Sequence, residues 1–233
     1  MSHAEGCLAR GYKTEPHLHL SEVSRCSHLC ADDMLAHYKA AGYHTVFVTD
    51  HLKASYFKGR EELSWREKME WFFTGYDAAK ALEQKHGITV LPGVEVLLAC
   101  SPNHYLLYGI TKELLFDLPG LFDMTPAELF AFANAHGVFV VQAHPYRDGV
   151  HSPTPESVHA VEAVNTNPRH ENFEPATKQM AQLHGLPITS GSDAHRPEDV
   201  GLGGVLTERP IESAADYIEA VKRGAITLLG EEK

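Results

Sequence analysis

The sequence predicts a single α/β domain built mainly from parallel strands, and three observations support this prediction. A helical stretch, a glycine and a short apolar run recur in that order along the chain. The apolar runs are rich in Val and Ile, which is typical of strands buried on both faces. The chain has 233 residues, a length at which α/β barrels commonly fold as one unit. We therefore expect one domain over residues 1–233, with right-handed helical crossovers between its strands.

The helix–glycine–strand units can be placed along the chain from their end signals. A glycine after a helix favours a left-handed C-terminal stop. Thr125 to Glu128 form a capping box with proline at the first helical position, and Ser213 can cap the last helix. Residues 55–75 are charged and aromatic, and we interpret them as a surface helix or as a helix bordering a site. The units cover residues 32–50, 78–93, 126–144, 177–193 and 215–230.

Composition narrows the class of protein and the partners it can have. Hydrophobic residues make up 43% and charged residues 22%, which is typical of a globular protein. No apolar run is long enough to cross a bilayer and no apolar signal region is visible, so we expect a cytoplasmic protein without a membrane partner. The formal charge of −11 disfavours a stable nucleic-acid complex. A small phosphorylated substrate is compatible with this charge, because metal ions invert the local potential.

Four cysteines are present, namely Cys7, Cys26, Cys30 and Cys100. They do not form a dense disulfide framework, so reduced thiols are the simpler interpretation. Cys26 and Cys30, with His28 between them, could hold zinc. No second pair stands at the spacing of a structural zinc site, which argues against that alternative.

The 16 histidines are unusual in number and in position. Several metal-type residues follow the ends of the apolar runs, where functional groups collect in parallel α/β folds. Other histidines directly precede helix-ending glycines, where they interact with exposed carbonyl groups, as we expect for His136. The residues with metal-type placement are His17, His19, His51, Glu95, His104, His144, Asp193 and His195.

The chemistry of these residue types fits a cluster of divalent ions. His17 and His19 are two apart, so in an extended segment they point to the same side. Glu95 can use both carboxylate oxygens to bridge two ions. Imidazole and carboxylate ligands suit zinc, iron or manganese. Ions about 3.5–4 Å apart would clamp a phosphoryl group and activate a shared water, which as hydroxide would be the nucleophile.

The order of the motifs resembles that of the polymerase-and-histidinol-phosphatase (PHP) superfamily. The resemblance implies a distorted seven-stranded (β/α) barrel of the TIM-barrel type, with up to three metal ions at its C-terminal face. It covers most of the chain. The matching pieces are His17-x-His19, Thr49-Asp50-His51, Gly93-Val94-Glu95, His104-x-Leu106, Ala143-His144-Pro145 and Gly191-Ser192-Asp193-Ala194-His195.

The resemblance also implies which ligands hold each of the three ions of a trinuclear site. The first ion would be held by His17, His19, Glu95 and Asp193, and the second by Glu95, His104 and His144. The third would be held by His51 and His195 with one further residue shortly after the His-x-His pair. In the family this further ligand is usually a His or Asp, and the segment after His19 in this chain departs from that pattern. Glu22 is our choice for it, with Cys26 and His28 as the alternatives.

Two arginines are candidates for substrate binding. Arg147 closely follows His144 and could hold a substrate phosphate through a bidentate contact. Arg169, which follows another apolar run, is the second candidate. An ordinary salt bridge is the alternative for both. Asn165 at the end of the same run could orient a ligand or serve a structural role.

Phosphoester hydrolysis is the leading functional hypothesis. The resemblance points to phosphomonoesters such as histidinol phosphate, or to nucleotides and short oligonucleotides. A C–N hydrolase of the amidohydrolase type is the first alternative, but no strand of this chain ends in the bridging lysine that such barrels often carry. A non-catalytic metal-binding module is the second alternative, and the near-complete ligand set argues against it.

Overall fold

A computed structural model describes residues 11–231, so Cys7 and both ends of the predicted domain lie outside the described part. One sheet forms the centre of the molecule, with the strand order β10-β9-β1-β2-β4-β5-β6-β7-β8 and the short β3 beside β4. The strands are β1 (Tyr12–Leu18), β2 (Tyr43–Val48), β3 (His51–Leu52), β4 (Thr89–Leu97), β5 (His104–Tyr108), β6 (Phe139–Gln142), β7 (Ala160–Asn165), β8 (Ile188–Gly191), β9 (Gly204–Thr207) and β10 (Thr227–Leu229).

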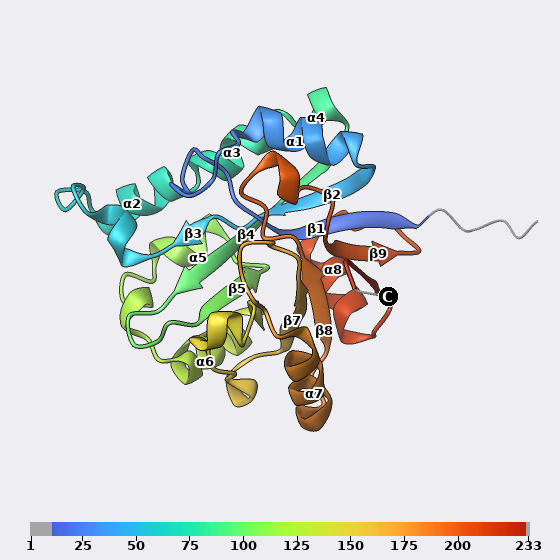
Figure 1. Ribbon diagram of the computed structural model, residues 1–233. Helices are drawn as coiled ribbons and strands as arrows, with labels where there is room; N and C mark the ends of the chain where they lie inside the picture. Colours follow the sequence, from blue (N-terminus) through green and yellow to red (C-terminus); the bar gives the residue numbers. More distant parts are fainter. Residues whose placement is uncertain (1–10, 232–233) are drawn as a thin grey trace, which may run out of the picture.

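The sheet curls into a nearly closed barrel, as Figure 1 shows. An isolated bridge between Leu18 and Ala194 joins the end of β1 to the segment after β8, so the two sides of the sheet meet. Inside the curl, Phe47 of β2 and Tyr108 of β5 have ring centroids 5.1 Å apart, and Tyr217 packs against both rings. The expected α/β barrel is therefore confirmed.

The expected parallel strands form most of the sheet, and the remaining strands are antiparallel to their neighbours. Strands β1, β2 and β4 are parallel, as are β6, β7 and β8. Strand β5 is antiparallel to β4 and to β6 because residues 98–103, which join β4 to β5, are too few for a helical crossover. Strands β9 and β10 are also antiparallel to their neighbours. The reversal of β5 places its first residue, His104, at the edge where the parallel strands end.

The helices surround the barrel. In Figure 1, α1, α3 and α4 lie together on one side of the sheet, while α6 and α7 lie on the opposite side. No helix within residues 11–231 is long and apolar enough to cross a membrane. The helices are α1 (Ala31–Ala40), α2 (Trp65–Phe72), α3 (Thr74–Ala81), α4 (Glu83–His86), α5 (Lys112–Phe116), α6 (Pro126–His136), α7 (Glu174–His184) and α8 (Ala214–Lys222).

The end signals of the helices are confirmed where the sequence predicts them. Thr125 and Glu128 form the capping box of α6, and the Ser213 side chain accepts a hydrogen bond from the first turn of α8. His136 lies with Nδ1 2.8 Å from the carbonyl oxygen of Phe132, as expected at a helix end. Residues 55–75 are divided between a short 3-10 helix, α2 and the start of α3 rather than forming one long helix.

Candidate metal centre

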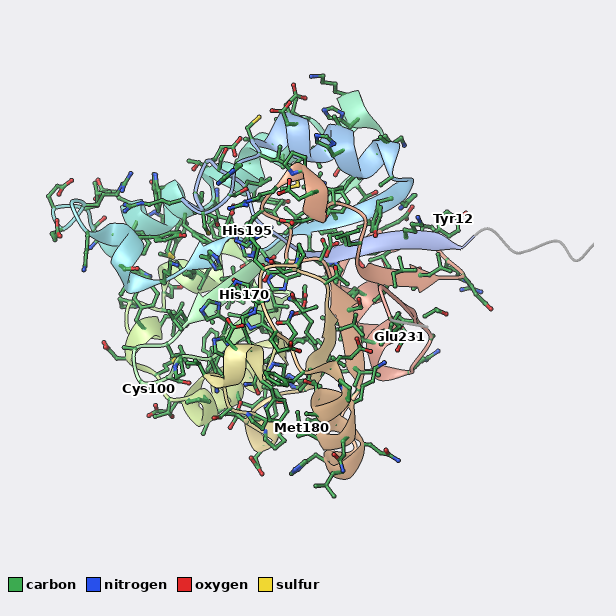
Figure 2. All side chains as sticks on the ribbon, viewed as in Figure 1. Tyr12, Cys100, His170, Met180, His195 and Glu231 are labelled. Atoms are coloured by element: carbon green, nitrogen blue, oxygen red, sulfur yellow. The ribbon has the colours of Figure 1, made fainter. Side chains whose placement is uncertain are left out.

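Imidazole and carboxylate groups gather at the edge of the barrel where the parallel strands end. Figure 2 shows His195 near the middle of the molecule, in the loop that follows β8. Each of the other predicted positions lies in or just beyond a strand at the same edge. All of them are buried except His104, which is partly exposed. The structure thus brings together His17, His19, His51, Glu95, His104, His144, Asp193 and His195.

Glu95 lies at the centre of this cluster and its two oxygens face different histidines. Its Oε1 is 2.9 Å from Nδ1 of His104 and 3.2 Å from Nε2 of His144. Its Oε2 contacts Nδ1 of His51 and lies 3.5 Å from Nε2 of His19. A carboxylate so placed has the geometry to bridge two cations.

Asp193 completes the opposite side of the cluster. Its Oδ1 lies 3.0 Å from Nε2 of His19 and 3.5 Å from Nε2 of His17. The same oxygen is 3.5 Å from Nδ1 of His195. Asp193 therefore shares two histidine neighbours with Glu95, which lies 3.5 Å from each of His17 and His19.

Buried polar atoms without partners show that the residues fit a cation. Nε2 of His17 and Nδ1 of His19 are buried and lack a hydrogen-bond partner among the described residues. Leaving such atoms unpaired is costly unless an ion or water satisfies them. Three groups have ligand atoms within 4.8 Å of one another, namely His17–His19–Glu95, His51–Glu95–His104 and His19–His51–His195.

Two residues of the cluster have strained backbones. His144 and Asp193 have φ angles of 32° and 50°, in the left-handed region that residues other than glycine rarely adopt. Strain of this kind costs about 1–3 kcal/mol and concentrates at functional sites. The structure therefore holds both side chains in place against a local backbone preference.

Two buried carboxylates beneath the cluster were missed by the sequence analysis. Glu162 of β7 has Oε1 2.8 Å from Nδ1 of His17, and its Oε2 accepts the backbone N–H of His144. Glu15 accepts the N–H of His17 at 2.8 Å and that of Ser192 at 3.1 Å. Burial raises the pKa of Glu15 to about 7. Glu162 is a single carboxylate within an apolar run, which is the signal that could have identified it, whereas Glu15 lies among polar residues and has no such signal.

Gly191 allows the cluster and its supports to pack closely. A Cβ atom at this position would lie 2.6 Å from Oε1 of Glu162 and 2.7 Å from Cβ of His17. Both distances are shorter than any ordinary carbon contact, so a larger residue would displace the support of His17. This explains the glycine in Gly191-Ser192-Asp193-Ala194-His195.

The electrostatics keep the carboxylates ionised. Burial would raise the pKa of Asp193, but Arg147 and then His17 hold it well below its usual value. The pKa of Glu95 is likewise held well below its usual value by the surrounding imidazoles, despite burial. Burial and the nearby imidazole of His51 lower the pKa of His19. Negative charge thus persists at the centre of a buried site, as cation binding requires.

Glu22 is placed differently from the other predicted ligands. Its Oε1 accepts a hydrogen bond from the N–H of Ala31 at 2.9 Å, while its Oε2 is buried without a hydrogen-bond partner among the described residues. It belongs to none of the three metal-type groups found in residues 11–231. The two alternatives, Cys26 and His28, are both exposed and also lie outside these groups, but the Cys26 thiol is in hydrogen-bonding contact with His51 and His195.

Arg147 lies at the rim of the cluster. Its Nη2 donates to Oδ2 of Asp193 at 2.6 Å and to Oδ1 of Asn165 at 2.9 Å. Asn165 in turn donates to Oε2 of Glu162 at 2.8 Å. Arg147 is therefore held beside a candidate metal ligand, at a place where an anion bound to the cluster would come within reach.

Arg169 is engaged in a bidentate salt bridge. Its Nη1 and Nη2 each donate to a carboxylate oxygen of Asp199 at 2.7 Å. Oδ2 of the buried Asp199 also accepts the backbone N–H of His195 at 2.9 Å. In this arrangement Arg169 supports the segment that carries His195, and its expected contact with substrate stays a prediction.

His151 is a further neighbour of the cluster that the sequence analysis did not select. Its Nδ1 lies 3.3 Å from Nδ1 of His144, and its ring centroid lies 5.6 Å from that of His104. It is partly exposed and comes from the loop after β6. The sequence around His151 contains no motif, and the residue comes close to the cluster only because the loop folds back toward it.

One known protein family matches part of the chain. The family described as PHP-associated matches residues 176–226, a segment that contains Asp193 and His195. No curated protein matches the chain.

Solved structures share the fold over nearly the whole chain at low sequence identity. One is a two-domain protein from Bacteroides vulgatus described as containing a predicted PHP-like metal-dependent phosphoesterase, with 17% identity and a TM-score of 0.64. This chain is covered to 94% and spans 64% of that protein. An amidohydrolase from Chromobacterium violaceum is 15% identical, with a TM-score of 0.57 and coverage of 94% and 99%. The lesion-specific endonuclease Q from Pyrococcus furiosus is 15% identical, with a TM-score of 0.61 and coverage of 94% and 57%.

The fold and the cluster define a metal-site α/β barrel. The family match over residues 176–226 and the shared fold support the expected resemblance to the PHP superfamily.

Proposed function

We propose that this chain is a metal-dependent phosphoesterase, formed by a single domain over residues 1–233. The observation that carries the proposal is the position of Glu95. Its two oxygens face separate histidines, and buried ligand atoms around it lack partners. A family match to the PHP-associated model and a structural neighbour described as PHP-like support the same chemistry.

In this proposal the cluster binds two or three divalent ions of zinc, iron or manganese. Mixed imidazole and carboxylate ligands suit these metals. When bound, the ions supply Lewis-acid activation of water and of the phosphoryl oxygens. The proposed ligands of the first ion are His17, His19, Glu95 and Asp193, those of the second are Glu95, His104 and His144, and those of the third include His51 and His195.

Three side chains around the cluster orient a metal ligand or contact the substrate in this proposal. Glu162 orients the imidazole of His17 by accepting from its Nδ1, as outer carboxylates commonly do for metal-binding histidines. Arg147 binds a phosphate oxygen of the substrate from its position beside Asp193. His151 lies on the partly exposed side of His144, where it can contact the rest of the substrate.

A small phosphorylated molecule is the proposed substrate. The net charge of −11 disfavours a long polyanion and so supports this choice. The structural similarity to endonuclease Q makes oligonucleotides a necessary arm of any test. C–N hydrolysis is the second candidate, because an amidohydrolase shares the fold over 99% of its own length.

A substrate panel tests the proposal. Phosphomonoesters, cyclic nucleotides, oligonucleotides and amides are offered to the purified protein with Mn, Fe or Zn added. We expect hydrolysis of phosphomonoesters, and its loss in the Asp193→Ala and His144→Ala variants. His37→Ala on the exposed face of α1 is the matched control. Hydrolysis at the parent rate in the two cluster variants, or cleavage of amides alone, would contradict the proposal.

A further inference from the structure

The loop between β1 and α1 is anchored on both sides of Cys26. Before it, Oγ of Ser24 accepts the N–H of His51 at 3.0 Å. After it, Oγ of Ser27 donates to the carbonyl oxygen of His19 at 2.8 Å, and the N–H of His28 donates to the carbonyl oxygen of His195 at 2.8 Å. The loop is therefore attached to three residues of the cluster, and these attachments determine where Cys26 lies.

The anchoring places the Cys26 thiol over two imidazoles of the cluster. The thiol is in hydrogen-bonding contact with His51 and with His195. The phenol oxygen of Tyr56 lies 3.6 Å from Sγ on another side. A third imidazole, that of His19, has a ligand atom within 4.8 Å of those of His51 and His195.

His19, which belongs to the same metal-type group as His51 and His195, provides an independent observation. His19 is completely buried, and its Nδ1 has no hydrogen-bond partner among residues 11–231. Glu22 of the same loop uses Oε1 to accept the N–H of Ala31 and belongs to none of the metal-type groups in residues 11–231. Cys26 of this loop presents its sulfur to His51 and His195.

We infer that Cys26 is a metal ligand, whose sulfur joins His51 and His195 at the third position of the centre. The inference rests on the proposed metal centre and deepens it. On binding, the thiol releases its proton to solvent and the thiolate coordinates the ion. One sulfur with two imidazoles favours zinc over manganese or magnesium, because soft thiolate donors select softer metals. The third position therefore differs in metal preference from the two positions that have only nitrogen and oxygen donors.

Cobalt substitution tests this inference without an activity assay. The full chain is loaded with Co²⁺, the bound ions are counted, and the near-ultraviolet absorption of a sulfur-to-cobalt bond is recorded. We expect this absorption in the parent and in the Cys100→Ser control, which changes an exposed thiol. Cys26→Ser should lose the absorption and about one ion per chain. Cys26→Asp should lose the absorption and keep the ion, because a carboxylate can replace the thiolate.

The outcomes separate this inference from the proposed function. Absorption that persists in Cys26→Ser, or that is missing from a parent protein holding three ions, overturns the assignment of Cys26. A parent that shows the absorption but hydrolyses no phosphoester supports Cys26 and rejects the function. Phosphoester hydrolysis by a parent that lacks the absorption supports the function and rejects Cys26.

Discussion

Oε1 of Glu162 lies 2.8 Å from Nδ1 of His17, and both side chains are completely enclosed. The other ring nitrogen, Nε2, faces Glu95 and Asp193 at 3.5 Å. The carboxylate of Glu162 therefore fixes the ring orientation in which the second nitrogen points into the cluster. Such outer partners set the tautomer and the basicity of metal-binding histidines.

Replacement of Glu162 should weaken metal binding without removing a ligand. A Glu162→Gln variant keeps the size of the side chain but loses the charge that supports His17. We expect about a 10–100-fold loss of metal affinity, the usual effect of changing such a partner. Competition with a metal chelator measures it, with Glu219→Gln on the surface as the control. Unchanged affinity would mean that Glu162 has no part in positioning His17.

The arginine beside Asp193 should govern substrate affinity. Arg147→Lys keeps the charge but cannot form the planar two-point contact of a guanidinium group. We expect KM for the phosphoester to rise about 10–100-fold, since a hydrogen bond to a charged group contributes about 1.5–3 kcal/mol. Steady-state kinetics measure this, with the exposed Arg223→Lys as the control. If kcat falls while KM stays constant, Arg147 does not hold the phosphate of the bound substrate.

Arg169 should affect stability more than substrate affinity. Arg169→Met leaves Asp199, which is fully buried, with only its backbone donors. We expect a loss of about 1–3 kcal/mol in the free energy of unfolding, the cost of a buried group deprived of a partner. Denaturant unfolding measures the loss, and KM is measured alongside. A raised KM with unchanged stability would favour the direct contact with substrate that the sequence suggests.

His159 predicts a pH dependence of stability away from the cluster. Its Nδ1 accepts the N–H of Val140 at 3.0 Å, and burial followed by the charge of Lys222 lowers the pKa of His159. The fold therefore favours the neutral imidazole. This contribution is complete above the unfolded pKa of about 6.5 and is lost as the pH falls below it.

A His159→Gln variant should accordingly show a smaller loss of stability on acidification. Denaturant unfolding at pH 7 and pH 5 gives the change for parent and variant under the same metal conditions. We expect the parent to lose more free energy of unfolding than the variant, with the exposed His37→Gln behaving like the parent. Equal losses in parent and His159→Gln would show that His159 does not contribute.

The sequence predicted those features that local pattern determines. Glycine stops and the Thr125 capping box depend on a few adjacent residues, and the structure confirms them. The candidate ligands could be found because strand ends share one edge of a barrel. The sequence analysis assigned no direction to β5, although the six residues 98–103 between β4 and β5 are too few for a helical crossover and so indicate an antiparallel strand.

Features that depend on how loops pack could not be predicted. The choice among Glu22, Cys26 and His28 depends on the path of one loop, in which Oε1 of Glu22 accepts the N–H of Ala31. His151 reaches His144 through another loop without any motif. Glu162 was missed for a different reason, because a carboxylate within an apolar strand reveals its partner only when the neighbouring strands are placed.

The count of metal ions bound by the parent and by Glu95→Gln tests the central claim most directly. Glu95 is proposed to bridge two ions, so its amide variant should weaken both positions together. We expect two or three ions per chain in the parent after loading with Zn, Fe or Mn, and the loss of at least two in Glu95→Gln. The exposed Glu219→Gln variant should match the parent. A parent that binds no ions, or a Glu95→Gln protein that keeps them all, would contradict the account.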